Sequence, residues 1–452
     1  MKIALITLGC PKNLVDAEVM MGLLDEAGHA LTGDPTEADV AIVNTCSFIS
    51  AAVAESRETI EECLVLKSRG ALAAVVVAGC LPQRYGRETL KMFPDVDAVV
   101  GCSDFAEIAG VVEAVSGGER PFVVNEPRSL YDHMSPRILG TPSHLAYVKI
   151  AEGCDNRCAY CTIPSIRGRL RSRSPDSVVS EATALRQLGI RELNIIAQDT
   201  TAYGTDIASS DAEIAGLLRR LADVGVPWLR LLYTHPAHIG AELLAVLAEG
   251  TVLPYLDVPI QHISDGVLSS MGRGIDGDGI RRLIDEARRV VPDLTIRTTV
   301  IVGYPGETES DFRELVEFVR TGRVDHLGIF EYSPEDGTPA AKLPGQVDAR
   351  TAAERAEHIH EIAVGMAARR GLEMVGRSVE VLCDAPGSGR TSGQAWELDG
   401  DAIWEPGGDG PTPGTFFTAR VVGAGDFDLV VEPAEDGEPA EGGEANGPPE
   451  TA

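Results

Sequence analysis

The 452-residue sequence has no apolar run long enough to cross a membrane. Its longest such stretch, ALAAVVVAGCL at 71–81, falls well short of the ~20 apolar residues that a membrane-spanning helix needs. The opening MKIALITLGCPKN has a brief apolar run but no cleavage site, so it predicts a first strand and not a signal peptide. We therefore expect a cytoplasmic protein with no membrane partner.

Basic residues are also scarce. The chain has 39 Lys plus Arg against 69 Asp plus Glu, a formal net charge of −30. Phosphate contacts need clustered cations, so this balance argues against general nucleic-acid binding. The negative charge is unevenly distributed along the chain. Residues 371–452 hold three arginines, no lysine and seventeen acidic residues, a formal charge of −14. Such a surface suits a basic partner.

The nine cysteines are not expected to form disulfides, because the cytosol keeps thiols reduced. Three of them, Cys154, Cys158 and Cys161, have the spacing C-x-x-x-C-x-x-C, with no fourth Cys or His nearby. A structural zinc site would need four ligands. An iron–sulfur cube fits better, because three thiolates leave one of its four irons open to bind a further ligand.

A second set of thiols, Cys10, Cys46 and Cys80, stands at the ends of predicted strands. The carboxyl ends of parallel strands meet at one edge of a sheet, so these three could converge on a second cluster. The alternative is that they are small buried residues, as free cysteines often are. Cys102 also ends a predicted strand, and spacing alone does not exclude it.

The length predicts two or three domains. Residues 1–125 alternate strand and helix patterns, which predicts a parallel α/β sheet. A second alternating series, 140–370, predicts a full or partial parallel βα barrel with its chemistry at the strands' C-terminal ends and a long exit helix at about 349–373. Short strands broken by Gly and Pro predict a small β-barrel over 371–433. The acidic tail, 434–452, is predicted to be disordered.

The quoted motifs resemble a known family. With Tyr160 in its aromatic position, CDNRCAYC resembles the signature of the radical S-adenosylmethionine (SAM) superfamily. Together with LGCPKNLVDAE, NTCSFI, AGCLPQRY and the terminal barrel, it resembles the radical-SAM methylthiotransferase family over essentially the whole chain except the tail. The resemblance implies an N-terminal α/β domain, a radical-SAM barrel and a C-terminal TRAM domain.

The same resemblance implies the cofactors. It places a SAM-binding [4Fe–4S] cluster on Cys154, Cys158 and Cys161, and an auxiliary [4Fe–4S] cluster on Cys10, Cys46 and Cys80. SAM would act both as methyl donor and as radical source, with an electron donor such as flavodoxin or ferredoxin. The remaining cysteines have no counterpart in the family pattern and are assigned to packing; they are Cys63, Cys102 and Cys383.

Several polar and glycine residues at strand ends are candidates for contacts with SAM. Besides Tyr160, these residues are Gln198, Asp199, Gln261, Arg297, Gly303 and Glu307. Four alternating arginines follow the cysteine loop, and they form either the solvated face of a strand or an anion-binding lip. These are Arg167, Arg169, Arg171 and Arg173.

The family divides between enzymes that modify tRNA adenosine and one that modifies the β-carbon of an aspartate in small-subunit ribosomal protein S-twelve. GCPKN and AEGCDNRCAYCTIPSIRG resemble the ribosomal-protein branch, whereas the tRNA branch typically has Gln-Met-Asn after the first cysteine. The acidic C-terminal region complements a basic protein. We therefore expect S-twelve as substrate, free or within the small subunit. The alternatives are a tRNA adenosine methylthiotransferase and a non-catalytic iron–sulfur sensor or electron carrier.

Overall fold

The computed structural model describes residues 1–208, 213–405 and 410–434. It divides into two compact units, Met1–Ile359 and His360–Ala452. The tail expected to be disordered lies, beyond Ala434, outside the described residues. Within the described ranges, no helix is both long and apolar enough to be a candidate membrane span.

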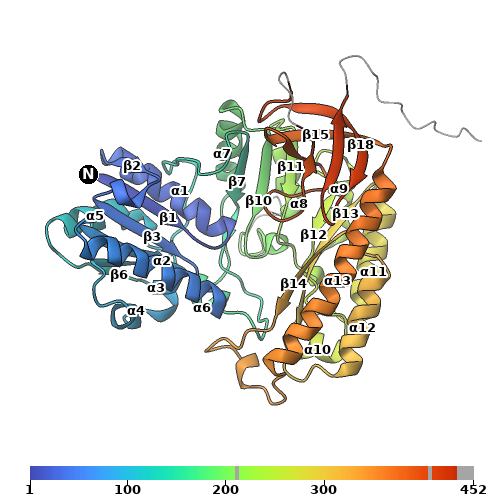
Figure 1. The fold of residues 1–452 in the computed structure, drawn as a ribbon, viewed down its shortest axis with the longest axis horizontal. Coiled ribbons are helices and arrows are strands. Elements are labelled where there is room, and N and C mark those ends of the chain that lie inside the picture. Colours follow the sequence, from blue (N-terminus) through green and yellow to red (C-terminus); the bar gives the residue numbers. More distant parts are fainter. Residues whose placement is uncertain (209–212, 406–409, 435–452) are drawn as a thin grey trace, which may run out of the picture. The chain divides into compact units, whose positions relative to one another are not determined.

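The first unit begins with a six-stranded, entirely parallel sheet (Figure 1). The segments KIALITLGC, ADVAIVNTC, AAVVVAGC and VDAVVGC have strand patterns and form four of these strands. The structure adds a short strand at each edge, too brief to give a period-two pattern. The spatial order is β2 (Ala30–Thr32), β1 (Lys2–Thr7), β3 (Val40–Thr45), β4 (Ala74–Gly79), β5 (Ala98–Gly101) and β6 (Phe122–Val123). The order reverses between β1 and β3, the point where open α/β sheets place their ligands.

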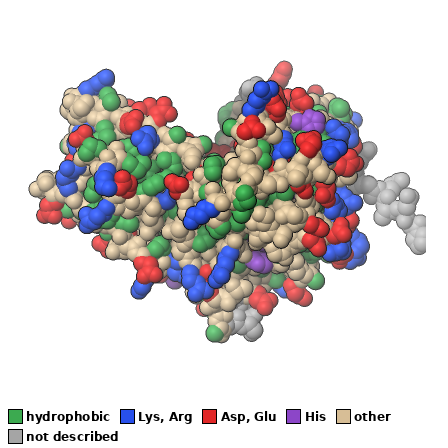
Figure 2. All heavy atoms as spheres, turned by 90° about the horizontal axis from the view of Figure 1, so that it is seen from below, with side chains coloured by type: hydrophobic (Ala, Val, Ile, Leu, Met, Phe, Trp, Pro, Cys, Tyr) green, Lys and Arg blue, Asp and Glu red, His purple; other side chains and the backbone are tan. Residues whose placement is uncertain are grey.

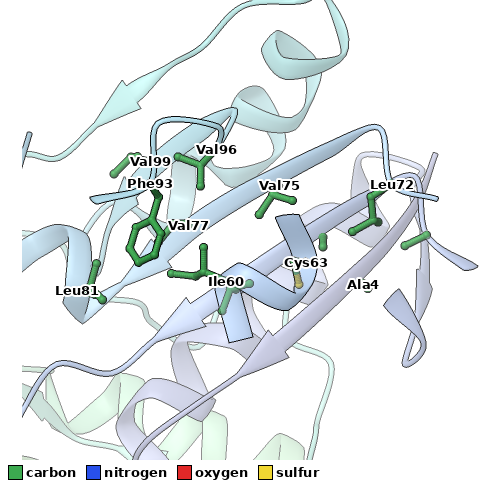
Figure 3. Packing of buried hydrophobic residues seen from close by; sticks show 13 residues of the cluster. Ala4, Ile60, Cys63, Leu72, Val75, Val77, Leu81, Phe93, Val96 and Val99 are labelled. Carbon is green, nitrogen blue, oxygen red and sulfur yellow. The ribbon is translucent and has the colours of Figure 1, made fainter. Parts of the chain in front are cut away.

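The two central strands of this sheet, β3 and β4, are buried along their whole length. Continuous apolar runs such as these fit parallel strands that are covered on both faces. The connecting helices are α1 (Pro11–Glu26), α2 (Ser50–Ser68), α3 (Cys80–Tyr85), α4 (Glu88–Met92) and α5 (Ile108–Ser116). Figure 3 shows Ile60 and Cys63 of α2 packed against Val75 and Val77 of β4 in one hydrophobic cluster.

The second part of this unit is a parallel βα barrel that remains partial. One sheet contains β7 (Leu145–Lys149), β10 (Glu192–Ile196) and β11 (Trp228–Leu231), and the next contains β12 (Tyr255–Asp257), β13 (Thr295–Val302) and β14 (His326–Glu331). Backbone hydrogen bonds between β11 and the segment around β12 join the two, including Leu253 N to Leu229 O at 2.8 Å. The expected parallel barrel architecture is thus confirmed.

Helices follow these strands and cover the outside of the barrel (Figure 1). They are α7 (Pro175–Gln187), α8 (Ile214–Ala222), α9 (Ala241–Ala248), α10 (Asp265–Met271), α11 (Gly277–Val290) and α12 (Glu309–Arg320). The short helix α6 (Ile163–Arg167) instead packs against α3 of the N-terminal sheet. Local sequence fixes where they begin: Thr308 and Asp311 form a reciprocal capping box at α12. Two short antiparallel strands, β8 (Ala151–Glu152) and β9 (Arg171–Ser172), pair at the two ends of the loop that carries the three-cysteine motif.

The long exit helix, α13 (Ala349–Met374), contains the boundary between the two units. The second unit is a closed five-stranded barrel, as expected. Its strands are β15 (Ser378–Ala385), β16 (Ser388–Thr391), β17 (Ala402–Ile403), β18 (Phe416–Ala424) and β19 (Leu429–Pro433). Its core packs Val381, Cys383 and Val421 around Trp404.

Candidate active site

The strand ends of the N-terminal sheet present three thiols at the reversal of strand order. Cys10 is the N-cap residue of α1 and lies three residues past Thr7, the last residue of β1. Cys46 follows β3, and Cys80 opens α3 directly after β4. Because β1, β3 and β4 are neighbours in a parallel sheet, these three thiols lie at one edge.

Two glycines make this close approach sterically feasible. Gly9 has φ +91° and Gly79 has φ +95°, a conformation that L-residues with a side chain rarely adopt. A Cβ on Gly9 would lie 2.7 Å from Cys46 Cβ and 2.9 Å from Cys46 Sγ. The backbone at Gly9, between β1 and Cys10, therefore passes against Cys46 with no room for a methyl group.

This contact gives a first prediction. Gly9→Ala should lower the free energy of unfolding by ~1–3 kcal/mol. The new methyl group would collide with Cys46, and alanine is strained in the left-handed backbone conformation that Gly9 adopts. It should also lower the iron bound after anaerobic reconstitution. Gly28→Ala is the matched control: Gly28 has φ +81° but nothing within 4 Å of its Cβ position. Equal iron content in both variants would contradict the role of the Gly9 contact.

Cys80 is in direct contact with groups from two other segments. The guanidinium Nη2 of Arg167 donates to Cys80 Sγ at 3.2 Å. Cys102 packs beside Cys80 and Ile166. A hydrogen bond from Cys102 and the charge of Arg167 lower the pKa of the Cys80 thiol, against the opposing effect of burial. Cys102, expected only to pack, thus also supports Cys80.

The other two extra cysteines lie in apolar surroundings. Cys63 is 2 % exposed and belongs to the hydrophobic cluster of α2 and β4 (Figure 3). Cys383 lies in the core of the C-terminal barrel. Burial raises the pKa of each thiol to about 11, so both stay protonated and serve as packing groups.

The C-x-x-x-C-x-x-C loop lies at the mouth of the partial barrel. Its three cysteines line a cavity of about 630 Å³, together with Asn156, Thr162 and the turn at 336–339. Arg273 is 4 % exposed and donates to Cys158 Sγ at 3.4 Å and to Tyr160 Oη at 3.4 Å. A buried guanidinium therefore lies in direct contact with the cysteine loop.

The three thiols of the cysteine loop fit a cluster better than a single ion. In the part of the chain that the structure describes, no three His, Cys, Asp or Glu side chains are placed to hold one metal ion. A single zinc would need every sulfur about 2.3 Å from one point. An iron–sulfur cube instead takes one thiolate on each of several irons, so its ligands stand farther apart. Half-buried thiols beside a cavity and a buried cation suit such a group.

One segment, 161–167, connects the two cysteine sets. Next to Cys161, the hydroxyl of Thr162 donates to the carbonyl of Phe48 at 3.2 Å, two residues past Cys46. At the other end of the segment, Arg167 reaches Cys80. Both sets therefore border the same region between the N-terminal sheet and the barrel mouth.

A buried charge network surrounds this segment. Arg167, 2 % exposed, pairs with Asp16 at 2.6 Å and with Glu152 at 3.2 Å. Lys149 of β7 pairs with the same two carboxylates, at 2.6 Å for Glu152. Burial would raise the pKa of Glu152, but the charges of Arg167 and Lys149 lower it to about 2. Because Asp16 belongs to α1, the network joins the N-terminal domain to the barrel.

The alternating arginines do not form one solvated strand face. Arg167 ends α6, and Arg173 is 3 % exposed and pairs with Glu181 at 2.5 Å. Arg169 alone extends into solvent, with a side-chain exposure of 88 %. The solvated-face interpretation is wrong for Arg167 and Arg173, because the expected strand is a helix end, a turn and two residues of β9.

The second barrel strand brings two predicted residues to the same region. The side-chain amide of Gln198 donates to Glu152 at 2.6 Å. Asp199 accepts from Asn156 at 2.7 Å and is paired with His238 at 2.9 Å, and it caps the short helix η3 (Thr200–Ala202). Asn156 lies within the cysteine loop, so Asp199 orients that loop.

Gln261 and Arg297 lie on the other half of the barrel. Gln261 has a positive φ of 74° and pairs its backbone with β13, an uncommon conformation that the sheet imposes. Arg297 of β13 donates to Asp257 at 3.3 Å and to Thr299 at 3.4 Å. These contacts hold its guanidinium at the β12–β13 edge.

Gly303 and Glu307 make their contacts with α13. A Cβ on Gly303, which has φ +74°, would lie 2.5 Å from Cβ of Ala352. Glu307 pairs with Arg355 at 3.1 Å and accepts from the backbone of Tyr304. The turn after β13 is therefore anchored on the exit helix.

Lys12, which the sequence analysis did not single out, is buried close to the Cys10 end of the auxiliary thiol set. It is 8 % exposed, and its Nζ lies 2.9 Å from the ring centroid of Tyr233, which follows β11. Burial lowers the pKa of Lys12 to about 8, against the raising effects of Cys10 and Asp257. Arg273 and Arg167 were likewise not predicted as thiol partners; only their long-range contacts reveal them.

Comparisons with known proteins agree with this geometry. Residues 2–101 match "Uncharacterized protein family UPF0004", and residues 148–319 match "Radical SAM superfamily". A solved structure of the radical S-adenosylmethionine methyltransferase TsrM from Kitasatospora setae superimposes with a TM-score of 0.55 at 19% identity, covering 90% of this chain and 80% of that one. The fold and the cysteine loop define a radical-SAM enzyme.

Two curated relatives narrow the class. "Ribosomal protein uS12 methylthiotransferase RimO" of Solibacter usitatus is 45% identical over 442 residues, which cover 95% of this chain and 94% of the relative. The protein of the same name from Heliobacterium modesticaldum is 45% identical over 439 residues, with 96% and 95% covered. The chain belongs to the methylthiotransferase family of radical-SAM enzymes.

Proposed function

We propose that this enzyme transfers a methylthio group to the β-carbon of an aspartate in ribosomal protein uS12, in the cytoplasm. The observation that carries the proposal is the segment 161–167, which places the two cysteine sets beside one region through Thr162–Phe48 and Arg167–Cys80. Methylthiolation needs both a sulfur site and a radical source, and here one substrate side chain can face both.

Each cysteine set has a distinct role in the proposal. Cys154, Cys158 and Cys161 would hold the cluster that binds SAM, and Cys10, Cys46 and Cys80 would hold the auxiliary cluster. When bound, these groups and SAM supply the methyl group, the sulfur site and the radical. The chain supplies positions: Arg273 donates to Cys158 Sγ, Arg167 donates to Cys80 Sγ, and Asp199 orients the cysteine loop through Asn156.

The charge of the chain favours a protein substrate. Residues 371–434 alone hold eleven acidic residues and three arginines, a formal charge of −8, so this barrel is acidic even without the tail. An RNA-gripping domain would normally be basic. On the face shown in Figure 2, acidic and basic side chains are interspersed. The acidic composition of residues 371–434 is what complements a basic ribosomal protein better than a phosphate backbone.

A competition assay tests the substrate. The protein is reconstituted anaerobically and supplied with SAM, a reductant and sulfide, together with a uS12 loop peptide and an unmodified tRNA. We expect mass spectrometry to find the methylthio group on the peptide's aspartate and none on adenosine. A methylthio group on adenosine would overturn the substrate assignment, and 5′-deoxyadenosine without either product would overturn the transfer reaction.

A further inference from the structure

Lys12 belongs to the N-terminal domain, and its ammonium group contacts a residue at the C-terminal end of a barrel strand. It lies two residues past Cys10, in the first turn of α1. Its ammonium rests 2.9 Å from the ring centroid of Tyr233, which stands at the C-terminal end of β11. Only 8 % of the residue is exposed.

The protein gives this buried ammonium no carboxylate partner. In the described ranges, no Asp or Glu oxygen lies within ion-pair distance of Lys12 Nζ, and its one recorded partner is the Tyr233 ring. Besides the Cys10 thiol two residues away, the acidic groups that act on this ammonium are carboxylates engaged elsewhere: Asp257 pairs with Arg297 at 3.3 Å and accepts from the Tyr233 N–H at 2.8 Å. Glu152 is shared by Lys149 and Arg167.

A buried ammonium with no carboxylate in contact is destabilising, and a ring face compensates only in part. A site with this property favours an incoming carboxylate. Its position suits one ligand in particular, because it lies at the edge where the auxiliary thiols gather and faces the barrel mouth. We propose that the ammonium of Lys12 binds the carboxylate of the aspartate that the enzyme modifies.

This assignment rests on the proposed function. In an aspartate the β-carbon is bonded directly to the carboxyl carbon. An ion pair between Lys12 and this carboxylate therefore holds the reacting β-carbon one bond away from the bound carboxyl group, close to Cys10. It also distinguishes aspartate from asparagine, since a neutral amide cannot neutralise the buried charge.

The test measures binding to the reconstituted protein of two uS12 loop peptides, one with the target aspartate and one with asparagine in its place. Wild-type protein should prefer the aspartate peptide by about 10- to 100-fold, the range of a charge-assisted contact. Lys12→Met should weaken the aspartate peptide by that factor and leave the asparagine peptide unchanged. Lys12→Arg, which keeps the charge, should retain a preference for aspartate.

The controls separate the other roles that Lys12 could have. Lys91→Met removes an exposed lysine of α4 and should change nothing; Lys91 has a side-chain exposure of 74 %. SAM affinity by equilibrium dialysis and iron per chain are measured for every variant, and both should equal the wild-type values. Weaker SAM binding with the aspartate preference intact would show that Lys12 binds the carboxylate of SAM, and would overturn the inference.

Two further outcomes would also decide the question. Loss of iron in Lys12→Met would show that Lys12 supports the Cys10 loop, and equal wild-type affinity for the two peptides would overturn the inference without any variant. Failure of the wild-type protein to bind or modify either peptide would refute the proposed function itself. The failures of the inference and of the function are therefore distinguishable.

Discussion

Replacing Cys80 by alanine should abolish methylthio transfer while leaving SAM cleavage in place. Cys80 is one of the three strand-end thiols proposed to hold the auxiliary cluster, and Arg167 is in direct contact with its sulfur at 3.2 Å. Loss of outer-shell partners already costs about 10- to 100-fold in metal affinity or activity, so loss of a ligand should cost more. We expect product to fall by more than ~100-fold, whereas 5′-deoxyadenosine still forms.

The measurement combines iron analysis, 5′-deoxyadenosine and methylthio product from the same reconstituted sample. Each [4Fe–4S] cluster holds four irons, so iron should fall from about eight to about four per chain. Cys102→Ala is the control, because Cys102 is 4 % exposed and packs directly beside Cys80. That variant should keep both clusters. If Cys102→Ala lost four irons and Cys80→Ala lost none, Cys102 would be the third ligand and the assignment would be wrong.

Replacing Arg167 by methionine should destabilise the protein strongly. The guanidinium is 2 % exposed and satisfies Asp16, Glu152, Asn13 and Cys80 at distances of 2.6–3.2 Å. Its removal leaves the buried carboxylates of Asp16 and Glu152 with Lys149 as their one shared cation among the described residues. Breaking a buried pair in this way costs about 3–5 kcal/mol, because a desolvated charge loses its partner.

Thermal and denaturant midpoints of the apoprotein check this expectation. Arg169→Met is the matched control two residues away, where an 88 % exposed guanidinium pairs with Asp155 at 3.1 Å. A solvent-exposed pair of this kind contributes little to stability, because water screens it. Arg167→Lys should be intermediate, since an ammonium keeps the charge but cannot reproduce the planar fork. Equal midpoints for Arg167→Met and Arg169→Met would show that the network contributes little to stability.

The sequence by itself determined the class of fold and the main elements. β3 and β4 are buried throughout and carry no charge, so their apolar runs predict parallel strands. The exit helix, expected at about 349–373, spans Ala349–Met374. The motif formed by Cys154, Cys158 and Cys161 could be recognised from the sequence because these three residues are close together in the chain. The short edge strands β2 and β6 were missed, because two or three residues show no alternation.

Only the tertiary structure decided which groups serve those thiols. Arg167 and Cys80 are 87 residues apart, and Arg273 and Cys158 are 115 apart, so no local pattern connects them. The alternating arginines show why: equal spacing suggested one shared face, yet folding buries Arg167 and exposes Arg169. Periodicity reports which face of an element is apolar, whereas the partner of a buried charge depends on what the rest of the chain packs against it.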